Sequence, residues 1–114
     1  MNVEIAHEAV EAIRGLPKPA QKKVLKALDK LRSARRPTGV EKLGGHSSLF
    51  RMKAGEYRIV FAYLDNQSVV VVLVVRHRKD AYKGLEILDQ KVVRIVEAFA
   101  GQNNNLNLTP QTDL

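Results

Sequence analysis

The 114-residue sequence contains no cysteine, so disulfide bonds and thiolate metal sites are excluded. Long apolar runs are also missing, because the longest one, Val69 to Val75, is far too short to cross a bilayer as a helix. The opening segment lacks the uninterrupted apolar stretch of a signal peptide. We therefore expect a cytoplasmic protein with no membrane association.

Acidic residues are scarce relative to basic ones. The chain has 12 Asp and Glu against 19 Lys and Arg, which gives a net charge of +7. Such a charge favours nucleic acid or an acidic protein over an acidic small metabolite as the main electrostatic partner. Charge alone does not choose between these two partners.

The length and an apolar share of 45% fit one domain with a hydrophobic core. Apolar periodicity and Gly or Pro stop signals divide the chain into elements. We predict a strand over 2–5, a helix from about His7 that stops at 15–17, a second helix opened by Pro17 and Pro19, a loop over 33–48, turns at 54–56 and 65–66, and a last helix over 85–100. Residues 101–114 are polar and lack periodicity, so we expect this tail to be disordered when the protein is alone.

Three consecutive strands are predicted downstream of the loop. In the first two, Arg51, Lys53 and Arg58 enter at positions where a buried strand would carry apolar groups. The third, Val69 to Val75, is apolar throughout, which is typical of a central strand covered on both faces. It breaks off into the basic segment RHRKD. The sheet is therefore expected to present cations at one end.

Together these elements predict an α+β domain over residues 1–100. An N-terminal strand and a helix hairpin would pack on a small antiparallel sheet of about four strands, followed by a C-terminal helix. The helices are expected mainly on one face, so that the other face is partly open and basic. The C-terminal helix carries apolar residues at helical spacing and must pack on the sheet or on another chain.

Four segments of the chain resemble a known family: LPKPAQKKVLKALDKL, KLGG, LFRMKAGEYRIVFAYLD and VVVVLVVRHRKDAYK. In combination they are similar to the RelE/ParE superfamily of toxins from bacterial and archaeal toxin–antitoxin modules, over about Met1 to Ala100. The RelE branch implies a RelE-like fold and a ribosome-dependent endonuclease that cuts mRNA without a metal. The ParE branch shares the scaffold but generally lacks the full set of basic residues, and it inhibits DNA gyrase by binding.

The RelE resemblance implies both catalytic and RNA-binding residues. The catalytic set is Arg51, Lys53, Arg58, Arg78 and Tyr82, and the RNA-binding set is Arg76, His77, Lys79 and Lys83. Arg51 stands where the best-known members have lysine, and an arginine cannot lose its proton at working pH, so it can stabilise charge but is a poor base. Lys53 is then the candidate base, with His77 as a competitor because imidazole titrates near neutrality.

The same residues also have structural interpretations. Alternating charges on strands are usually a solvated face of an open sheet, and Tyr82 could simply pack. Arg76, where many relatives carry glycine, could grip RNA or pair with Glu56 or an antitoxin carboxylate. Acids are few around the basic residues, with only Glu56, Asp65 and Asp80 between positions 49 and 83, which disfavours a magnesium site. The three histidines lack the spacing of a zinc site, so no cofactor is expected.

Two main classes of function remain open. The first is a toxin that cleaves mRNA on the ribosome by attack of the RNA 2′-hydroxyl on the adjacent phosphate. A cognate antitoxin would silence it in a shared oligomer, through an acidic segment that folds on the basic sheet. The second is a ParE-like gyrase inhibitor. A weakly active toxin that acts mainly as co-repressor with its antitoxin is a further alternative, because of Arg51.

Overall fold

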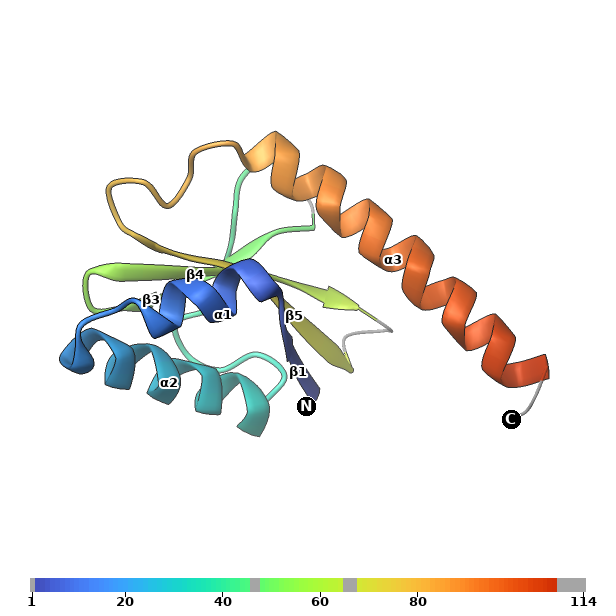
Figure 1. Ribbon diagram of the computed structural model, residues 1–114, viewed down its shortest axis with the longest axis horizontal. Coiled ribbons are helices and arrows are strands. Elements are labelled where there is room, and N and C mark those ends of the chain that lie inside the picture. The colour runs from blue at the N-terminus through green and yellow to red at the C-terminus, as the bar shows by residue number, and fades with distance from the viewer. Residues whose placement is uncertain (1, 46–47, 65–67, 109–114) are drawn as a thin grey trace.

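The computed structural model describes residues 2–45, 48–64 and 68–108, with the backbone alone described over 99–108 (Figure 1). Its elements run in the order β1 (Asn2–Ile5), α1 (His7–Arg14), α2 (Lys18–Ser33), β2 (Glu41–Lys42), β3 (Phe50–Ala54), β4 (Tyr57–Leu64), β5 (Val69–His77) and α3 (Leu85–Leu108). The predicted positions of the first strand, the helix hairpin and the three long strands are confirmed.

A five-stranded sheet in the order β1-β5-β4-β3-β2 forms the centre of the molecule. The predicted α+β class is confirmed, but two details of the predicted sheet were wrong. The sheet is mixed rather than antiparallel, because β1 occupies the free edge of β5 and runs parallel to it. It also has an extra strand, β2, which lies within the predicted loop and is too short to show an alternating pattern.

The hairpin of α1 and α2 covers one face of the sheet. Pro19 lies in the first turn of α2, where a missing backbone N–H breaks no helical hydrogen bond. Val24, Leu28 and Leu31 repeat at helical spacing on α2 and are fully buried. They form one hydrophobic core with inward-facing residues of the strands, among them Phe61. This core holds the helix hairpin against one face of the sheet.

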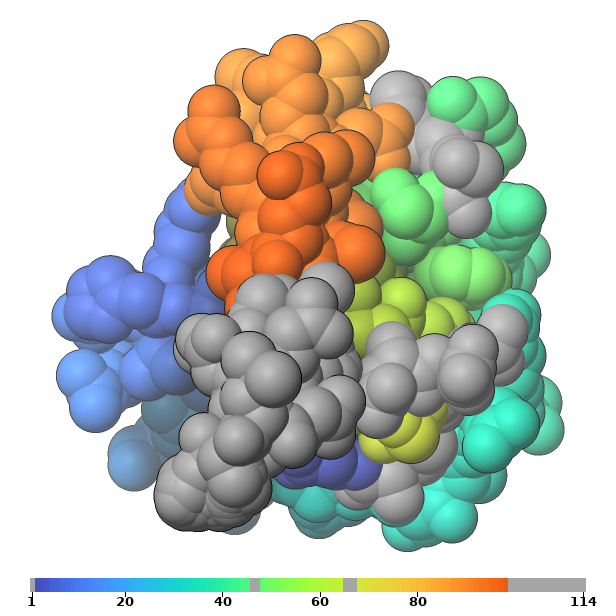
Figure 2. Space-filling view, turned by 90° about the vertical axis from the view of Figure 1, so that its right-hand side faces the viewer, coloured from blue at the N-terminus to red at the C-terminus, as the bar shows by residue number. Residues whose placement is uncertain are grey.

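Helix α3 lies across the opposite face, as Figure 2 shows for its first turns over the strands. Its Leu88 and Val92 are buried in a second core together with apolar residues of β4 and β5. Two polar contacts add to this packing: Lys91 Nζ lies 2.9 Å from Glu8 Oε1 of α1, and Ser48 Oγ donates to Asp89 Oδ1 at 2.9 Å. The helices therefore lie on both faces of the sheet, and the prediction that they lie mainly on one face was wrong. Helix α3 leaves uncovered the end of its face near the turn between β3 and β4 (Figure 1).

The predicted end of the last helix at Ala100 was wrong, since α3 continues to Leu108. Extending a formed helix adds one hydrogen bond per residue without a new nucleation step, so polar residues can follow an anchored helix. Residues 109–114 and the predicted turn at 65–66 lie outside the described residues. The disorder of the tail stays a prediction.

An extra residue in β5 interrupts the regular pairing of the sheet. Val60 pairs with Val74 and Phe61 pairs with Val72, so Leu73 has no opposite residue on β4. Such a β-bulge shifts the in–out alternation of a strand by one residue. Leu73 and Val74 consequently both belong to the core under α3. All residues of β5 after the bulge point to the face opposite to the one that regular alternation predicts.

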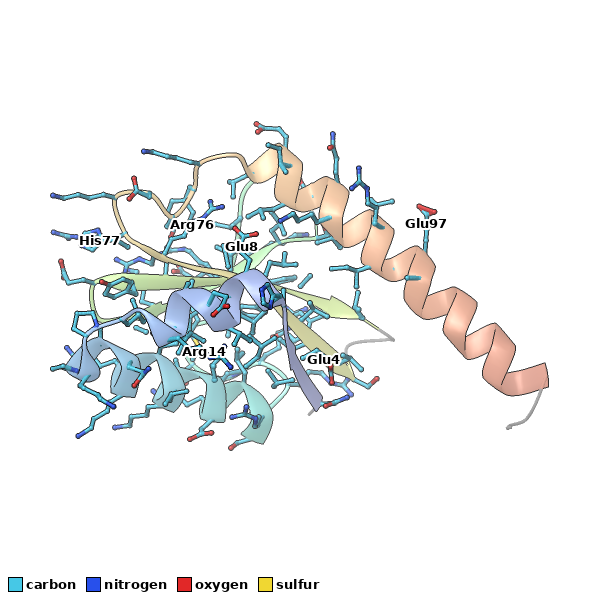
Figure 3. All side chains as sticks on the ribbon, in the orientation of Figure 1. Glu4, Glu8, Arg14, Arg76, His77 and Glu97 are labelled. Atoms are coloured by element: carbon cyan, nitrogen blue, oxygen red, sulfur yellow. The ribbon has the colours of Figure 1, made fainter. Side chains whose placement is uncertain are left out.

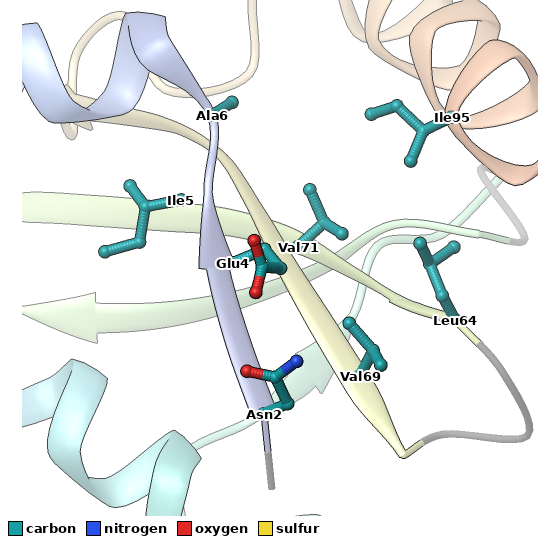
Figure 4. Close-up of a pocket in the computed structure, with 8 residues that line it drawn as sticks. All are labelled: Asn2, Glu4, Ile5, Ala6, Leu64, Val69, Val71 and Ile95. Atoms are coloured by element: carbon teal, nitrogen blue, oxygen red, sulfur yellow. The ribbon is translucent and has the colours of Figure 1, made fainter. Parts of the chain in front are cut away.

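A cavity of about 470 Å³ opens between β1, the ends of β4 and β5, and α3 (Figure 4). Its walls are mainly apolar, with Asn2 and Glu4 as polar exceptions. It lies where Leu64 pairs with Val69, at the other end of β4 from the turn that follows β3. In the described part of the chain, no helix is long and apolar enough to cross a membrane.

Substitution of Glu8 by Gln tests the polar contact that attaches α3 to α1. The hydrogen bond from Lys91 holds the pKa of Glu8 below its ordinary value of 4.5. A carboxyl group with a lowered pKa in the folded state adds stability above its ordinary pKa, and this stability is lost as the pH falls through the lowered value. Both side chains are about half exposed, so we expect Glu8→Gln to cost only about 0.5 kcal/mol near pH 7.

Urea unfolding at low salt measures this difference as the pH is lowered from about 7 to about 2. The difference between Glu8→Gln and the parent should shrink as the pH falls below 4.5. Glu97→Gln, which changes an exposed glutamate farther along α3, is the control. A difference that stays constant with pH would show that the Glu8 charge does not attach α3.

Candidate functional site

Three cations stand side by side across the end of the sheet on the face that carries α3. Lys53 on β3 pairs with Arg58 on β4, and Arg58 pairs with Arg76 on β5. We call Lys53, Arg58 and Arg76 the cation row. Directly opposite side chains on one face lie within interaction distance, and like charges there are unfavourable. The sheet is therefore built with a local excess of positive charge at this end.

The bulge in β5 decides which side chains join this row. Val75 packs in the core under the helix hairpin, so the next residue, Arg76, points to the α3 face. Figure 3 shows Arg76 near Glu8, and the positive charge of Arg76 contributes to the lowered pKa of that carboxyl group after the larger effect of Lys91. His77 points the opposite way.

His77 contacts Tyr57, which packs on the core under the helix hairpin, and their ring centres are 5.5 Å apart in an edge-to-face arrangement. The imidazole Nδ1 accepts a hydrogen bond from the backbone N–H of Lys79 at 3.2 Å. The two candidate bases therefore lie on opposite faces of the sheet, with Lys53 in the cation row and His77 outside it.

Arg51 lies on the same face as the row, two residues before Lys53 on β3. Its side chain contacts two groups. Its Nη2 is 2.6 Å from Glu41 Oε1 on β2, and its Nη1 donates to the Tyr82 hydroxyl at 3.0 Å. The Arg51 side chain is only 21% exposed. Sequence reasoning missed Glu41, since nothing in the predicted loop indicated that β2 pairs with β3 at this residue. The structure brings Arg51 and Tyr82 together as a pair.

The turn between β3 and β4 ties down two of the predicted catalytic arginines. Arg58 Nη1 donates to the carbonyl oxygens of Gly55 and Tyr57, at 3.0 and 2.9 Å. The backbone N–H of Arg78 donates to the carbonyl oxygen of Glu56 at 2.8 Å, and its Nε lies 3.2 Å from Glu56 Oε1. Both side chains of that ion pair are more than half exposed, so it is weak and can open for another anion.

The proposed pairing of Arg76 with Glu56 was wrong, because Arg78 occupies Glu56. Arg76 Nη1 instead donates to the backbone carbonyl of Lys83 at 2.8 Å. The Lys83 ammonium lies 2.8 Å from Asp80 Oδ1, and this hydrogen bond holds the pKa of Asp80 below its ordinary value. The segment between β5 and α3 is thus hydrogen-bonded to the row through Arg76.

Each acid around the row is matched to a cation outside the row. Glu41 pairs with Arg51, Glu56 with Arg78, and Asp80 with Lys83. Among the residues that the structure describes, the three members of the cation row form no ion pair with a carboxylate. The row therefore keeps an excess of positive charge, although the charge of Arg76 also acts on the nearby carboxylates of Glu8 and Asp80, and it is a candidate site for an anionic ligand.

Lys79 is exposed and contributes only a backbone N–H to the contacts described above. Within the described ranges, no three His, Asp or Glu side chains gather as a metal site would require. The predicted site residues thus fall into four places: the row, the pair of Arg51 with Tyr82, the basic segment after β5 with Arg78, Lys79 and Lys83, and His77 on the opposite face.

The fold and this surface define a toxin of the RelE/ParE superfamily, and the predicted resemblance is confirmed. The family model described as the ParE toxin of the type II toxin–antitoxin system, parDE, matches residues 3–82. The chain therefore belongs to the ParE toxin family of type II toxin–antitoxin systems. The match includes the whole cation row and ends at Tyr82.

Solved structures of RelE proteins are similar to this chain. A chain of the archaeal RelE–RelB complex from Pyrococcus horikoshii OT3 is 28% identical with a TM-score of 0.56, over 70% of this chain and 97% of that one. The isolated E. coli RelE toxin is 24% identical with a TM-score of 0.57, over 82% and 97% of the two chains. This second likeness shows the fold alone. The comparison with curated proteins found no match.

Substitution of Gly55 tests how strongly the turn between β3 and β4 depends on the left-handed backbone conformation of this residue. Its φ is +62°, and an added Cβ would lie 2.8 Å from Cδ of Lys23. The Lys23 side chain is flexible and can move aside, so the left-handed backbone should account for most of the cost. We expect Gly55→Ala to lower the free energy of unfolding by about 1 to 2 kcal/mol in urea unfolding.

Gly44→Ala is the matched control. Gly44 has no positive φ, and an added Cβ would meet nothing within 4 Å. We expect a change within about 0.5 kcal/mol for this variant. Equal losses of stability for the two variants would show that the conformation of Gly55 is not what fixes the turn.

Proposed function

We propose that this toxin is a ribosome-dependent mRNA endonuclease that acts in the cytoplasm. The observation that carries the proposal is the cation row of Lys53, Arg58 and Arg76, which lies across three strands and forms no ion pair with a carboxylate of the described residues. Cleavage by the RNA 2′-hydroxyl passes through a phosphorane that carries more negative charge than the starting phosphate. Fixed cations aimed at that charge stabilise the transition state more than the ground state.

The row also contains a candidate base. The attacking 2′-hydroxyl must lose its proton, and neither Arg58 nor Arg76 can accept one because guanidinium groups stay protonated in proteins. Lys53 is the one member of the row whose neutral form can act as a base. Its side chain makes no hydrogen bond or ion pair with the described residues, so its amine is free to approach RNA. This chemistry requires no metal ion.

The open shape of the site is consistent with an RNA substrate that is held in position by another molecule. The row lies on an open face of the sheet, and the cavity beside β1 is at the other end of the β4–β5 pair. An open cationic surface gives little positioning of its own, although alignment of the 2′-hydroxyl with the phosphate is worth several powers of ten in rate. A ribosome that holds mRNA in a fixed conformation would supply this alignment.

A cognate antitoxin is the second partner of the proposed function. The similar proteins from P. horikoshii and E. coli were crystallised as RelE–RelB and RelBE complexes. For this chain we propose an antitoxin with an acidic segment that covers Arg51, Lys53, Arg76 and Arg78. Opposite charges would speed its association, and the bound segment would exclude RNA from the row.

Inhibition of DNA gyrase is the second candidate function, because the matching family model is that of ParE toxins. Binding to gyrase needs no proton acceptor in the row. A Lys53→Arg variant, which keeps the charge of Lys53 but cannot act as a base, therefore separates the two candidates.

Primer extension on an mRNA translated in vitro tests the proposed function. The purified toxin should produce new cuts when ribosomes translate the message, and none on the same RNA without ribosomes. Lys53→Arg should cut about a hundredfold more slowly, since loss of a general base typically costs that much or more. Lys26→Arg, the same change on the exposed side of α2, should cut at the parental rate.

The other outcomes are equally informative. Cleavage by Lys53→Arg at the parental rate would show that Lys53 contributes charge alone, and His77→Gln would then be the next variant to measure. No cleavage by the parent, together with inhibition of gyrase supercoiling, would replace the proposed function by the second candidate.

A further inference from the structure

Glu41, Arg51 and Tyr82 form a chain of contacts beside the cation row. The Glu41 carboxylate lies 2.6 Å from one terminal nitrogen of Arg51, and the other terminal nitrogen donates to the Tyr82 hydroxyl at 3.0 Å. We propose that Glu41 is a positioning residue, which acts through Arg51 to hold Tyr82 as the proton donor to the leaving 5′-oxygen of RNA. This proposal rests on the proposed endonuclease function and adds one residue and one role to it.

The hydrogen bond between Arg51 and Tyr82 has a defined direction. A guanidinium group has donors and no acceptor, so the Tyr82 oxygen must accept. The hydroxyl proton of Tyr82 is then free to point away from Arg51. Tyr82 is 40% exposed, so this proton can reach a bound ligand. A tyrosine in this arrangement is a donor toward the RNA, and its oxygen faces a permanent positive charge.

Glu41 fixes the other end of Arg51. Glu41 on β2 and Arg51 on β3 are directly opposite each other in the register of the two strands. The planar guanidinium presents its two terminal nitrogens to two different partners, which fixes its orientation as well as its position. The Arg51 side chain is 21% exposed against 58% for Glu41, so the charge that faces Tyr82 is the better shielded of the two. Without Glu41, the guanidinium could turn away from Tyr82.

The proton balance of the reaction closes with this assignment. The 2′-hydroxyl gives its proton to the neutral Lys53 amine, and its oxygen forms a bond to phosphorus. The bond between phosphorus and the 5′-oxygen breaks, its electron pair goes to that oxygen, and the oxygen takes the proton of Tyr82. The Tyr82 phenolate, stabilised by Arg51, regains a proton from solvent while Lys53 releases one, so the products are a 2′,3′-cyclic phosphate and a 5′-hydroxyl.

An mRNA in which sulfur replaces the bridging 5′-oxygen at one mapped cut tests this role. A thiolate leaves without needing a proton, so a variant that has lost only the proton donor recovers its rate on the sulfur substrate. The measurement is the single-turnover rate constant on translating ribosomes, with half-saturating toxin concentration measured separately. The proteins are the parent, Glu41→Gln, Tyr82→Phe, and Glu97→Gln as a control for the lost charge.

On ordinary mRNA we expect Glu41→Gln to lower the rate constant about tenfold and Tyr82→Phe to lower it about a hundredfold, with half-saturation unchanged. On the sulfur substrate both variants should cut within about twofold of the parent, because the proton donor is no longer needed. Glu97→Gln should match the parent on both substrates. Thermal unfolding of each variant checks whether its fold is intact.

Three results would overturn the proposal. An equal loss on both substrates would show that Glu41 and Tyr82 act elsewhere than in leaving-group protonation. A parental or raised rate for Glu41→Gln on ordinary mRNA would show that Glu41 only screens the charge of Arg51. A parent that cuts neither substrate would remove the endonuclease function itself, and this inference with it, which separates the two failures.

Discussion

The β-bulge at Leu73 is the constraint on which the basic surface depends. Because one residue of β5 has no opposite residue on β4, the strand resumes its alternation out of phase, and Arg76 falls beside Arg58. With regular pairing, Arg76 would point toward the helix hairpin, where a charged side chain would need a partner to be buried. The bulge thus places Arg76, near the end of an apolar central strand, as the third member of the cation row. The apolar residues of the strand remain buried in the two cores.

A row of like charges costs stability, and the rest of the fold offsets that cost. The sheet has a hydrophobic core on each face, one under the helix hairpin and one under α3. These cores hold the strands in register, so the three cations cannot move apart without disturbing buried residues. The acids beside the row form ion pairs only with cations that are not members of the row. Repulsion among the three cations would be reduced by a bound polyanion, which favours binding at this end of the sheet.

Sequence reasoning succeeded where a local pattern determines the structure. Alternation placed β3 and β4, and Gly and Pro signals placed the two N-terminal helices. It failed for β2, since two residues carry no periodicity, and for the end of α3, since polar residues can extend an anchored helix. The phase of β5 could not be predicted, because a run of seven apolar residues looks the same with or without a bulge. The row, and the pairing of Glu41 with Arg51, are therefore properties of the sheet register and not of any motif.

The central claim is that the RNA's own 2′-hydroxyl attacks a phosphate that lies over the cation row. An mRNA with a single 2′-deoxynucleotide on the 5′ side of one mapped cut tests this directly, when it is translated in the presence of the toxin and read by primer extension. Our account predicts that the cut at this phosphate disappears while cuts at other positions remain. A cut that persists at the deoxynucleotide would contradict the account, since the nucleophile would then have to come from elsewhere.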